Sequence, residues 1–201
     1  MLAILHAAGW PIWFLIATSI IGLALIIERL ISLRDSRYLN PKQIDDAFEL
    51  AALATPPAHR LRELEVAQGF GRLAATLISL RNQPETIRHQ ATEEQGRSLA
   101  FMLHRYLPAL ATVAVIAPLL GLFGTVVGMI ELFGSYQPQG SDPSQLARGI
   151  SIALYNTGFG ILIAIVALIA HRYFSSRADY LLHRLELEAS RLNRFLSSVT
   201  P

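Results

Sequence analysis

Two threonines, Thr125 and Thr157, lie near the middle of two long apolar segments and are the first candidates for chemistry. A threonine hydroxyl donates and accepts hydrogen bonds, but it does not hold a proton of its own near neutral pH. There is no Asp, Glu, His, Lys or Arg between Leu107 and Ile130 or between Ile150 and Ala170. Proton relays in membranes use ionisable groups at that depth. A proton path through these segments would therefore need a carboxylate from another chain.

Both threonines share a helix face with small residues. At 100° per residue, a face of the second segment carries Pro118, Gly121, Thr125 and Gly128, and Gly124 lies to one side, where a neighbouring helix can press close. The third segment carries a comparable face with Ala153, Thr157, Gly160 and Ala164, and Asn156 adjoins Thr157. Two interpretations stay open. Small residues let membrane helices pack closely, and the same faces could line a narrow path for water or protons.

These faces need membrane-spanning helices to position them, and the sequence supplies three apolar blocks, Ile12–Ile27, Leu107–Ile130 and Ile150–Ala170. Each extends to about the 20 residues that a helix needs to cross the hydrocarbon core. The first block is not typical of a cleavable signal peptide, because no Lys or Arg precedes it and its charges follow it. We therefore predict an all-α membrane protein with three transmembrane helices, two of them long and extending into the cytoplasm.

The basic residues predict how the chain crosses the membrane. Of the 17 Lys and Arg residues only Arg148 lies between the second and third blocks, and none precedes the first block. By the positive-inside rule the N-terminus is periplasmic and the C-terminus cytoplasmic. The predicted order is a periplasmic N-terminus (1–9), transmembrane helix 1 (10–31), a cytoplasmic helical region (32–106), transmembrane helix 2 (107–133), a periplasmic loop (134–148), transmembrane helix 3 (149–171) and a cytoplasmic helical tail (172–201).

The predicted cytoplasmic parts are helical. Helices are expected over Pro41–Ala54 and Arg60–Arg81, separated by Pro56-Pro57, and we interpret them as too small to build a core of their own. From Glu85 the helix signals run without a strong break to Phe133, with Pro108 and Pro118 as tolerated kinks. The tail is amphipathic, with Glu188 interrupting an apolar stripe formed by Leu181, Leu185, Leu192, Phe195, Leu196 and Val199.

Composition excludes several other functions. The formal charge of +2 is small and no basic patch stands alone, which argues against nucleic acid as a partner. The chain has no cysteine, no His cluster with metal-ligand spacing, no phosphate-binding loop and no nucleophile triad. We therefore predict neither an enzyme nor a metal or cofactor site; protons would be the transported ion.

Two stretches carry a family resemblance. "APLLGLFGTVVGMIELF" (Ala117–Phe133) and "GISIALYNTGFGILIAIVALIAHRYF" (Gly149–Phe174) resemble the second and third helices of the MotA/TolQ/ExbB proton-channel family, and "IIERLISLR" (Ile26–Arg34) resembles its first-helix exit. The chain has three predicted spans, with a cytoplasmic insert between the first two, and this arrangement favours the ExbB/TolQ branch of the family. Within this branch the chain is most like ExbB. The resemblance implies a ring-shaped homo-oligomer, a pentamer, in the bacterial inner membrane. It also implies an ExbD- or TolR-like single-span partner that supplies an aspartate, and a TonB- or TolA-like transducer. By motif position the lumen-facing threonines of the family correspond to Thr125 and Thr157.

The chain departs from the family at two positions. Ile152 stands where many relatives carry an acidic residue, and Val166 stands where they carry a proline. Three alternatives remain open: a TolQ-like subunit of the Tol-Pal system, another rotary stator of the family, and, from a different class, a passive membrane scaffold. The sequence does not decide which transducer is driven, and the ring stoichiometry rests on the resemblance alone.

Overall fold

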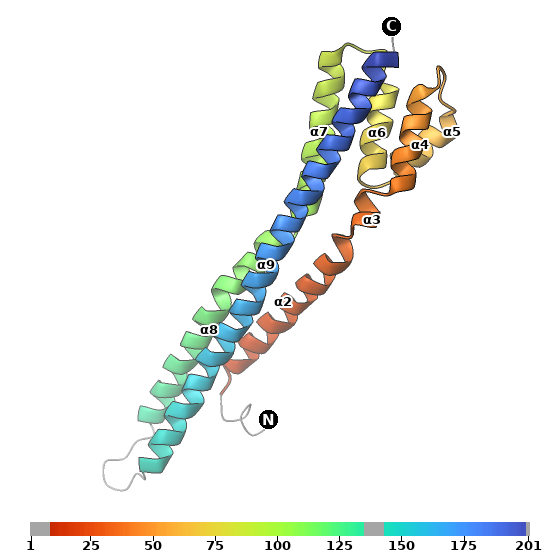
Figure 1. Ribbon diagram of the computed structural model, residues 1–201. Helices are drawn as coiled ribbons and strands as arrows, with labels where there is room; N and C mark the ends of the chain where they lie inside the picture. Colours follow the sequence, from red (N-terminus) through yellow and green to blue (C-terminus); the bar gives the residue numbers. More distant parts are fainter. Residues whose placement is uncertain (1–8, 135–142, 200–201) are drawn as a thin grey trace. The chain divides into compact units, whose positions relative to one another are not determined.

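The computed structural model describes residues 9–134 and 143–199, and every element in these ranges is a helix (Figure 1). The helices are α2 (Ile12–Ser32), α3 (Asp35–Tyr38), α4 (Pro41–Ala52), α5 (Ala58–Val66), α6 (Phe70–Ser79), α7 (Glu85–His104), α8 (Leu107–Gly134) and α9 (Pro143–Val199). Nearly all of the predicted periplasmic N-terminus and residues 135–142 of the predicted periplasmic loop lie outside the described residues.

Three helical stretches are long and apolar enough to cross a membrane, which confirms the predicted fold class. They are Ile12–Ser32, Glu85–Gly134 and Gly149–Val199. The third lies in α9, a single helix of 57 residues. The span and the predicted tail therefore form one unbroken helix.

The helix break between α7 and α8 differs from the sequence prediction. The chain was expected to stay helical from Glu85 to Phe133, but α7 ends at His104 and Tyr106 takes a left-handed φ of 66°. Pro108 accounts for this break, because its ring in a helix interior would clash with the carbonyl of His104, four residues earlier. In the first turn of α8 the same proline is tolerated. Only Pro118 lies inside the helix, as predicted.

The described residues form two compact units. We call residues 9–29, 106–134 and 143–173 the span unit, and residues 30–105 and 174–199 the bundle unit. In the span unit large apolar side chains remain exposed on all three helices, among them Ile20, Leu119 and Ile169. A soluble protein would bury such a surface, so this exposure fits a lipid environment or contact with further chains.

The bundle unit has a hydrophobic core, which the short helices build only together with α7 and the end of α9. The helices α4, α5, α6 and α7 contact one another, and the last part of α9 contributes a buried stripe to the same core. Its most deeply buried large side chains are Leu50, Phe70, Leu77, Leu99, Leu103, Leu181, Leu185, Leu192 and Leu196. The sequence signals were dispersed, because each short helix contributes only a few of these residues.

The amphipathic stripe of the tail lies in this core at four of its six predicted positions. Leu181, Leu185, Leu192 and Leu196 are buried, Val199 is exposed, and Phe195 stacks edge-on against Phe48 of α4. Glu188 interrupts the stripe without leaving a buried charge unpaired, since its carboxylate accepts hydrogen bonds of 3.0 and 2.8 Å from Arg191.

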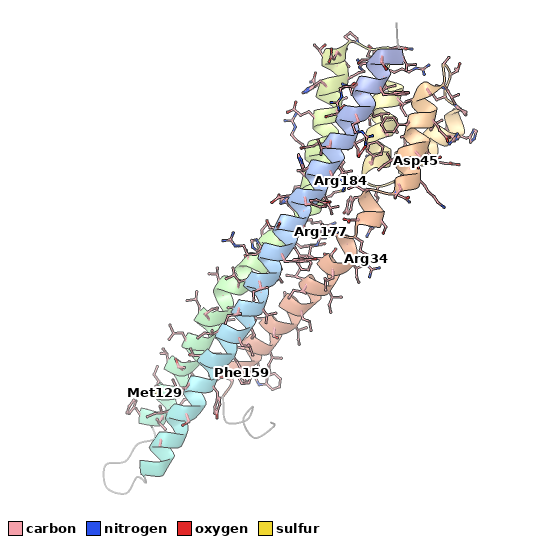
Figure 2. The ribbon with its side chains drawn as sticks, viewed as in Figure 1. Arg34, Asp45, Met129, Phe159, Arg177 and Arg184 are labelled. Atoms are coloured by element: carbon pink, nitrogen blue, oxygen red, sulfur yellow. The ribbon has the colours of Figure 1, made fainter. Side chains whose placement is uncertain are left out.

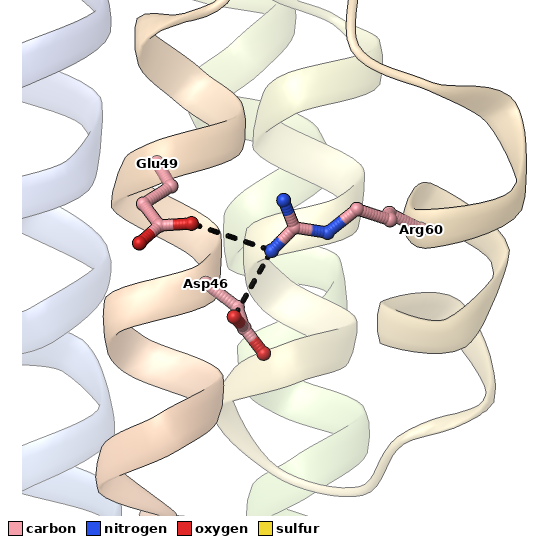
Figure 3. A network of polar contacts seen from close by, with 3 residues as sticks. All are labelled: Asp46, Glu49 and Arg60. Atoms are coloured by element: carbon pink, nitrogen blue, oxygen red, sulfur yellow. Dashed lines mark hydrogen bonds and ion pairs between the residues drawn. The ribbon is translucent and has the colours of Figure 1, made fainter.

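Polar contacts orient the shorter helices on this core. Arg60 of α5 bridges Asp46 and Glu49 of α4 at 3.0 and 3.4 Å (Figure 3). All three side chains are partly exposed, so we expect each of the two ion pairs to contribute at most about 1 kcal/mol to stability. On α9, Arg177 and Arg184, labelled in Figure 2, both lie against the ring of Tyr180. The hydrogen bond from Arg184 to the Tyr180 hydroxyl raises the pKa of that guanidinium.

A left-handed glycine separates α5 from α6, where the sequence predicted one helix over Arg60–Arg81. Gly69 has a φ of 68°, and a Cβ at this position would collide with the backbone of Tyr38. Only glycine combines this φ with so close an approach. The predicted break at Pro56-Pro57, by contrast, lies between α4 and α5 as expected.

We expect Gly69→Ala to destabilise the bundle unit by about 2–4 kcal/mol, because it adds both left-handed strain and a backbone clash. The change is measured as a lower thermal midpoint of the helical circular dichroism signal in detergent. Gly96→Ala is the matched control, since a Cβ at Gly96 in α7 meets nothing within 4 Å. Alanine there should leave stability unchanged or raise it by up to about 1 kcal/mol. Equal midpoints for the two variants would contradict the backbone conformation at Gly69.

Candidate functional site

The helices α8 and α9 lie side by side in the span unit (Figure 1). They approach each other through glycines. A Cβ at Gly121 would lie 2.8 Å from the Asn156 carbonyl oxygen and 3.0 Å from the Thr157 Cα. A Cβ at Gly160 would lie 2.5 Å from the Ala117 carbonyl oxygen and 3.1 Å from the Gly121 Cα. These distances leave no room for a side chain, so the two main chains are in direct contact. We call this contact, centred on Gly121 and Gly160, the glycine crossing.

Asn156 fills the space beside the crossing. Its side chain is fully buried, and a Cβ at Gly124 would lie 2.9 Å from its Nδ2 and 3.0 Å from its Cβ. Gly124 is therefore a contact residue, in agreement with the prediction that a neighbouring helix presses close at this position. An amide in the middle of an apolar span is costly unless it is enclosed by protein, and the structure encloses it.

The remaining small residues extend the same contact. A Cβ at Gly128 would lie 3.5 Å from the Ala153 Cβ, and both Ala153 and Ala164 are buried. Pro118 is half-buried inside α8. The close-packing interpretation thus describes what the glycines and alanines do in this chain. It does not describe the threonines, which lie at the rim of the contact.

Thr125 lies about 70° around α8 from the centre of the face formed by Ala117, Gly121, Gly124 and Gly128. It is half-buried, and its hydroxyl donates a 2.7 Å hydrogen bond to the carbonyl of Leu122. It also lines an open recess of about 480 Å³ on the surface of α8. Of the described residues that line this recess, only Thr125 is polar; the others are Val126, Met129, Ile130 and Phe133 (Met129 is labelled in Figure 2).

Thr157 lies across the crossing, on α9, beside Gly121. Its Cα is level with Gly121, four residues before Thr125, and its side chain is half-buried. At 1.5 Å per residue, the two threonines are offset by about 6 Å along the helix axis. A side chain of another protein that moved along the helix pair by about one turn could therefore make hydrogen bonds with both hydroxyls.

Charged groups lie at the ends of the spans. Glu131 is near the end of α8 that adjoins Gly9, and His171 is at the opposite end of the α9 span. The two threonines thus lie in a stretch without an Asp, Glu, His, Lys or Arg of this chain. The side chain of Ile152 lies outside the described residues, and Val166 is exposed on α9.

Sequence reasoning missed the burial of Arg29. This arginine, in the last turn of α2, is only 2% exposed. Its guanidinium pairs with Glu28 through contacts of 2.5 and 2.7 Å and lies 5.3 Å from the centre of the Tyr106 ring. The signal was present in "IIERLISLR", since an acid directly before an arginine at the end of an apolar block offers a local counter-charge. The arrangement is a buried cation held by an anion and an aromatic face.

The sequence was compared with a family profile and with individual known proteins. The sequence profile of the MotA/TolQ/ExbB proton channel family matches residues 40–187, which include the whole glycine crossing and both threonines. The biopolymer transport protein exbB1 of Vibrio cholerae is 30% identical over 201 residues, covering 96% of this chain and 86% of the relative.

Two further relatives extend the comparison. A putative biopolymer transport protein ExbB homolog of Methanothermobacter thermautotrophicus is 27% identical over 190 residues, covering 93% of this chain and 67% of the relative. The Tol-Pal system protein TolQ of Pseudomonas aeruginosa is 36% identical over 113 residues, covering 52% of this chain and 49% of the relative.

Proposed function

The chain belongs to the MotA/TolQ/ExbB proton channel family, and from that premise we propose that it is an ExbB-like subunit of a proton-driven motor in the bacterial inner membrane. In this proposal protons pass along a path that includes Thr125 and Thr157. The motor uses the proton motive force to energise a TonB-like transducer and thereby transport across the outer membrane. The proposal involves no catalytic residue, metal or cofactor of this chain.

One observation carries the proposal: two half-buried hydroxyls, one on each helix, lie beside a tight main-chain contact in a stretch with no Asp, Glu, His, Lys or Arg of this chain. Such hydroxyls can hold water and make hydrogen bonds to a proton carrier, but they cannot carry the proton themselves. The acid must therefore come from a partner. The apolar recess beside Thr125 is a surface on which another helix could lie.

The partners follow from the same reasoning. We propose a homo-oligomer, a pentamer, that surrounds an ExbD- or TolR-like single-span protein bearing an aspartate. The N-terminus is periplasmic and the C-terminus cytoplasmic, as the distribution of Lys and Arg favours.

Reconstitution into liposomes tests this function. The chain alone should add little proton flux, and the complex captured through an affinity tag on this chain should conduct protons when a membrane potential is applied. The captured complex should contain a short single-span protein with an Asp or Glu in its span. Proton flux that is equally absent with and without the captured partner would favour the passive scaffold.

A TolQ-like role is the second candidate, because the chain is 36% identical to a TolQ over 52% of its length. The two candidates differ in the transducer. Co-capture of a TolA-like protein in place of a TonB-like protein would favour the TolQ-like role.

A further inference from the structure

In the bundle unit α7 lies beside the last part of α9, and two contacts fix how the helices line up (Figure 1). The imidazole Nε2 of His104 lies 3.2 Å from a carboxylate oxygen of Asp179. Nearer the other end of α7, Arg88 donates a 2.9 Å hydrogen bond to the Ser197 hydroxyl. Residue numbers therefore rise along α7 as they fall along α9, so the two helices are antiparallel. Counting from both contacts shows which residues of α9 are level with a given residue of α7.

One face of α7 carries a row of exposed side chains, Ile87, Glu94 and Phe101, which we call the α7 row. The seven-residue spacing keeps them on one face of the helix. Ile87 is 44% and Phe101 78% exposed, and Glu94 is exposed as well. At 100° per residue the row lies about 160° around α7 from Gly96, which lines a groove that α7 shares with α9. The α7 row therefore faces away from α9.

The end of α9 carries a second exposed surface, which we call the α9 face. It consists of two groups of four residues at the spacing i, i+3, i+4, i+7, and the groups share Leu187. The first group is Tyr180, His183, Arg184 and Leu187, and the second is Leu187, Ser190, Arg191 and Arg194. Tyr180 is 46% and Leu187 49% exposed. Both lie on average about 120° around α9 from Glu186 and Asn193, which line the shared groove, so the α9 face also points away from α7.

The α7 row and the α9 face match in height and in chemistry. Phe101 is level with residues 182–184, which lie inside the first group, between two large apolar side chains. Glu94 is level with residues 189–191, inside the second group, which holds two arginines. A group of four at this spacing forms the hole into which one side chain of a facing helix packs. The aromatic side chain therefore matches the hole with apolar walls, and the acidic side chain matches the basic hole.

Within one molecule these two surfaces cannot meet, because they point away from each other. We infer that the α7 row of one copy packs into the α9 face of the next copy, and that this contact joins the bundle units of the homo-oligomer. Two different surfaces on different sides of a subunit make a head-to-tail contact, which can close into a ring. A rotation about an axis along the helices leaves the height of every residue unchanged, so the match in height also holds between copies.

This inference rests on the proposed function, which includes a homo-oligomer, and it deepens that function by naming an interface. Isolated apolar side chains on a protein surface need no partner. These side chains differ, because they recur at coiled-coil spacing and because the complementary surface is present on the same chain. In the contact, the ring of Phe101 lies beside the guanidinium of Arg184, which already lies against Tyr180. A second such contact to an aromatic face adds to the attraction.

Cysteine crosslinking tests the contact, because the chain has no cysteine of its own. Phe101→Cys is combined with Arg184→Cys in the whole chain, and membranes that contain it are treated with a thiol-to-thiol crosslinker of about 8–10 Å, the distance between the axes of packed helices. We expect bands at multiples of the monomer mass on a denaturing gel. A crosslink within one chain would leave the monomer mass unchanged.

The matched control combines Phe101→Cys with Ser198→Cys. Ser198 lies on the same side of α9 as Tyr180, but about 22 Å along the helix from the level of Phe101. The same crosslinker cannot span this distance between helices in the proposed register. The control should therefore stay at the monomer mass.

Charge reversal tests the acidic side chain of the row. In the chain with both cysteines at the matched level, Glu94→Arg adds a third positive charge beside Arg191 and Arg194. It should lower the yield of crosslinked chains at least about fivefold. Adding Arg194→Glu supplies an opposite charge again and should restore most of the yield. Glu65→Arg is the control, since Glu65 is exposed on α5, outside both surfaces, and should leave the yield unchanged. Equal thermal midpoints in detergent show that all these variants are folded.

The interface is supported if only the level-matched cysteine pair gives the series of bands and the charge variants lower and restore its yield. Equal bands from both cysteine pairs, or a yield that does not respond to Glu94→Arg, overturn it. Crosslinking to a protein of different mass also overturns it, because the surfaces would then bind another chain. An oligomer on size-exclusion chromatography that gives no bands rejects this interface and leaves the proposed function standing. A chain that is monomeric even in the captured complex overturns the homo-oligomer of the proposed function itself.

Discussion

Replacing both Thr125 and Thr157 by valine is expected to reduce the proton flux of the captured complex to the background of empty liposomes. Valine has nearly the shape of threonine but no hydroxyl, so the helices still fit together while the path loses both of its hydrogen-bonding groups at mid-membrane depth. A partner acid would then face only apolar side chains and main chain, where the charged form is strongly disfavoured. We expect a loss of at least about 100-fold, since two hydrogen bonds to a carrier are each worth about 1.5 kcal/mol or more when it is charged.

The control is the pair Thr18→Val and Thr112→Val, whose hydroxyls donate to their own helix carbonyls and lie outside the site. The doubly substituted control should keep wild-type flux. Assembly is followed by size-exclusion chromatography of the complex in detergent, and both doubly substituted complexes should elute as the wild type does. Near-normal flux in the Thr125→Val, Thr157→Val complex would remove the threonines from the path.

The second large effect is expected at the glycine crossing, from a single methyl group. In Gly160→Ala the new Cβ would lie 2.5 Å from the Ala117 carbonyl oxygen and 3.1 Å from the Gly121 Cα. The helices must then separate, and we expect the span unit to lose about 2–3 kcal/mol of stability. Flux should fall with it, because separating the helices changes the spacing of Thr125 and Thr157.

Gly158→Ala is the matched control for this variant. It lies two residues away on the same helix, and its added Cβ meets nothing within 4 Å. We expect its thermal midpoint in detergent to equal or slightly exceed that of the wild type, because alanine favours the helix. If the Gly160→Ala and Gly158→Ala proteins have the same thermal midpoint and the same proton flux, the two main chains are not in direct contact at Gly160.

The sequence predicted the spans well because their signal is local and strong. Long charge-free blocks give the three membrane-length helices directly, and the structure bears them out. The breaks at Tyr106 and Gly69 were missed for a physical reason. Each depends on a single left-handed residue whose conformation is set by its surroundings: the proline two residues after Tyr106, and the backbone of Tyr38 against Gly69.

The site was predictable in part. Spacing at 100° per residue located the small residues and both threonines, but it could not say which helix each face meets. The structure assigns Gly121, Gly124 and Gly160 to contact between α8 and α9, and leaves Thr125 and Thr157 at its rim. Whether a threonine hydroxyl donates a hydrogen bond to its own helix, as Thr125 does, depends on the side-chain rotamer. The rotamer has no signature in the sequence. The burial of Arg29 likewise depends on Tyr106, 77 positions further along the chain.

The glycine crossing also has a mechanical meaning. Contacts between side chains yield under load by rotamer changes, whereas main chains that touch directly can yield only if the helices themselves bend or part. A force applied along or around α9 is therefore passed to α8 with little elastic loss near Gly121 and Gly160. The two helices therefore move together as one rigid pair at this level, which would suit the proton-driven motor proposed above.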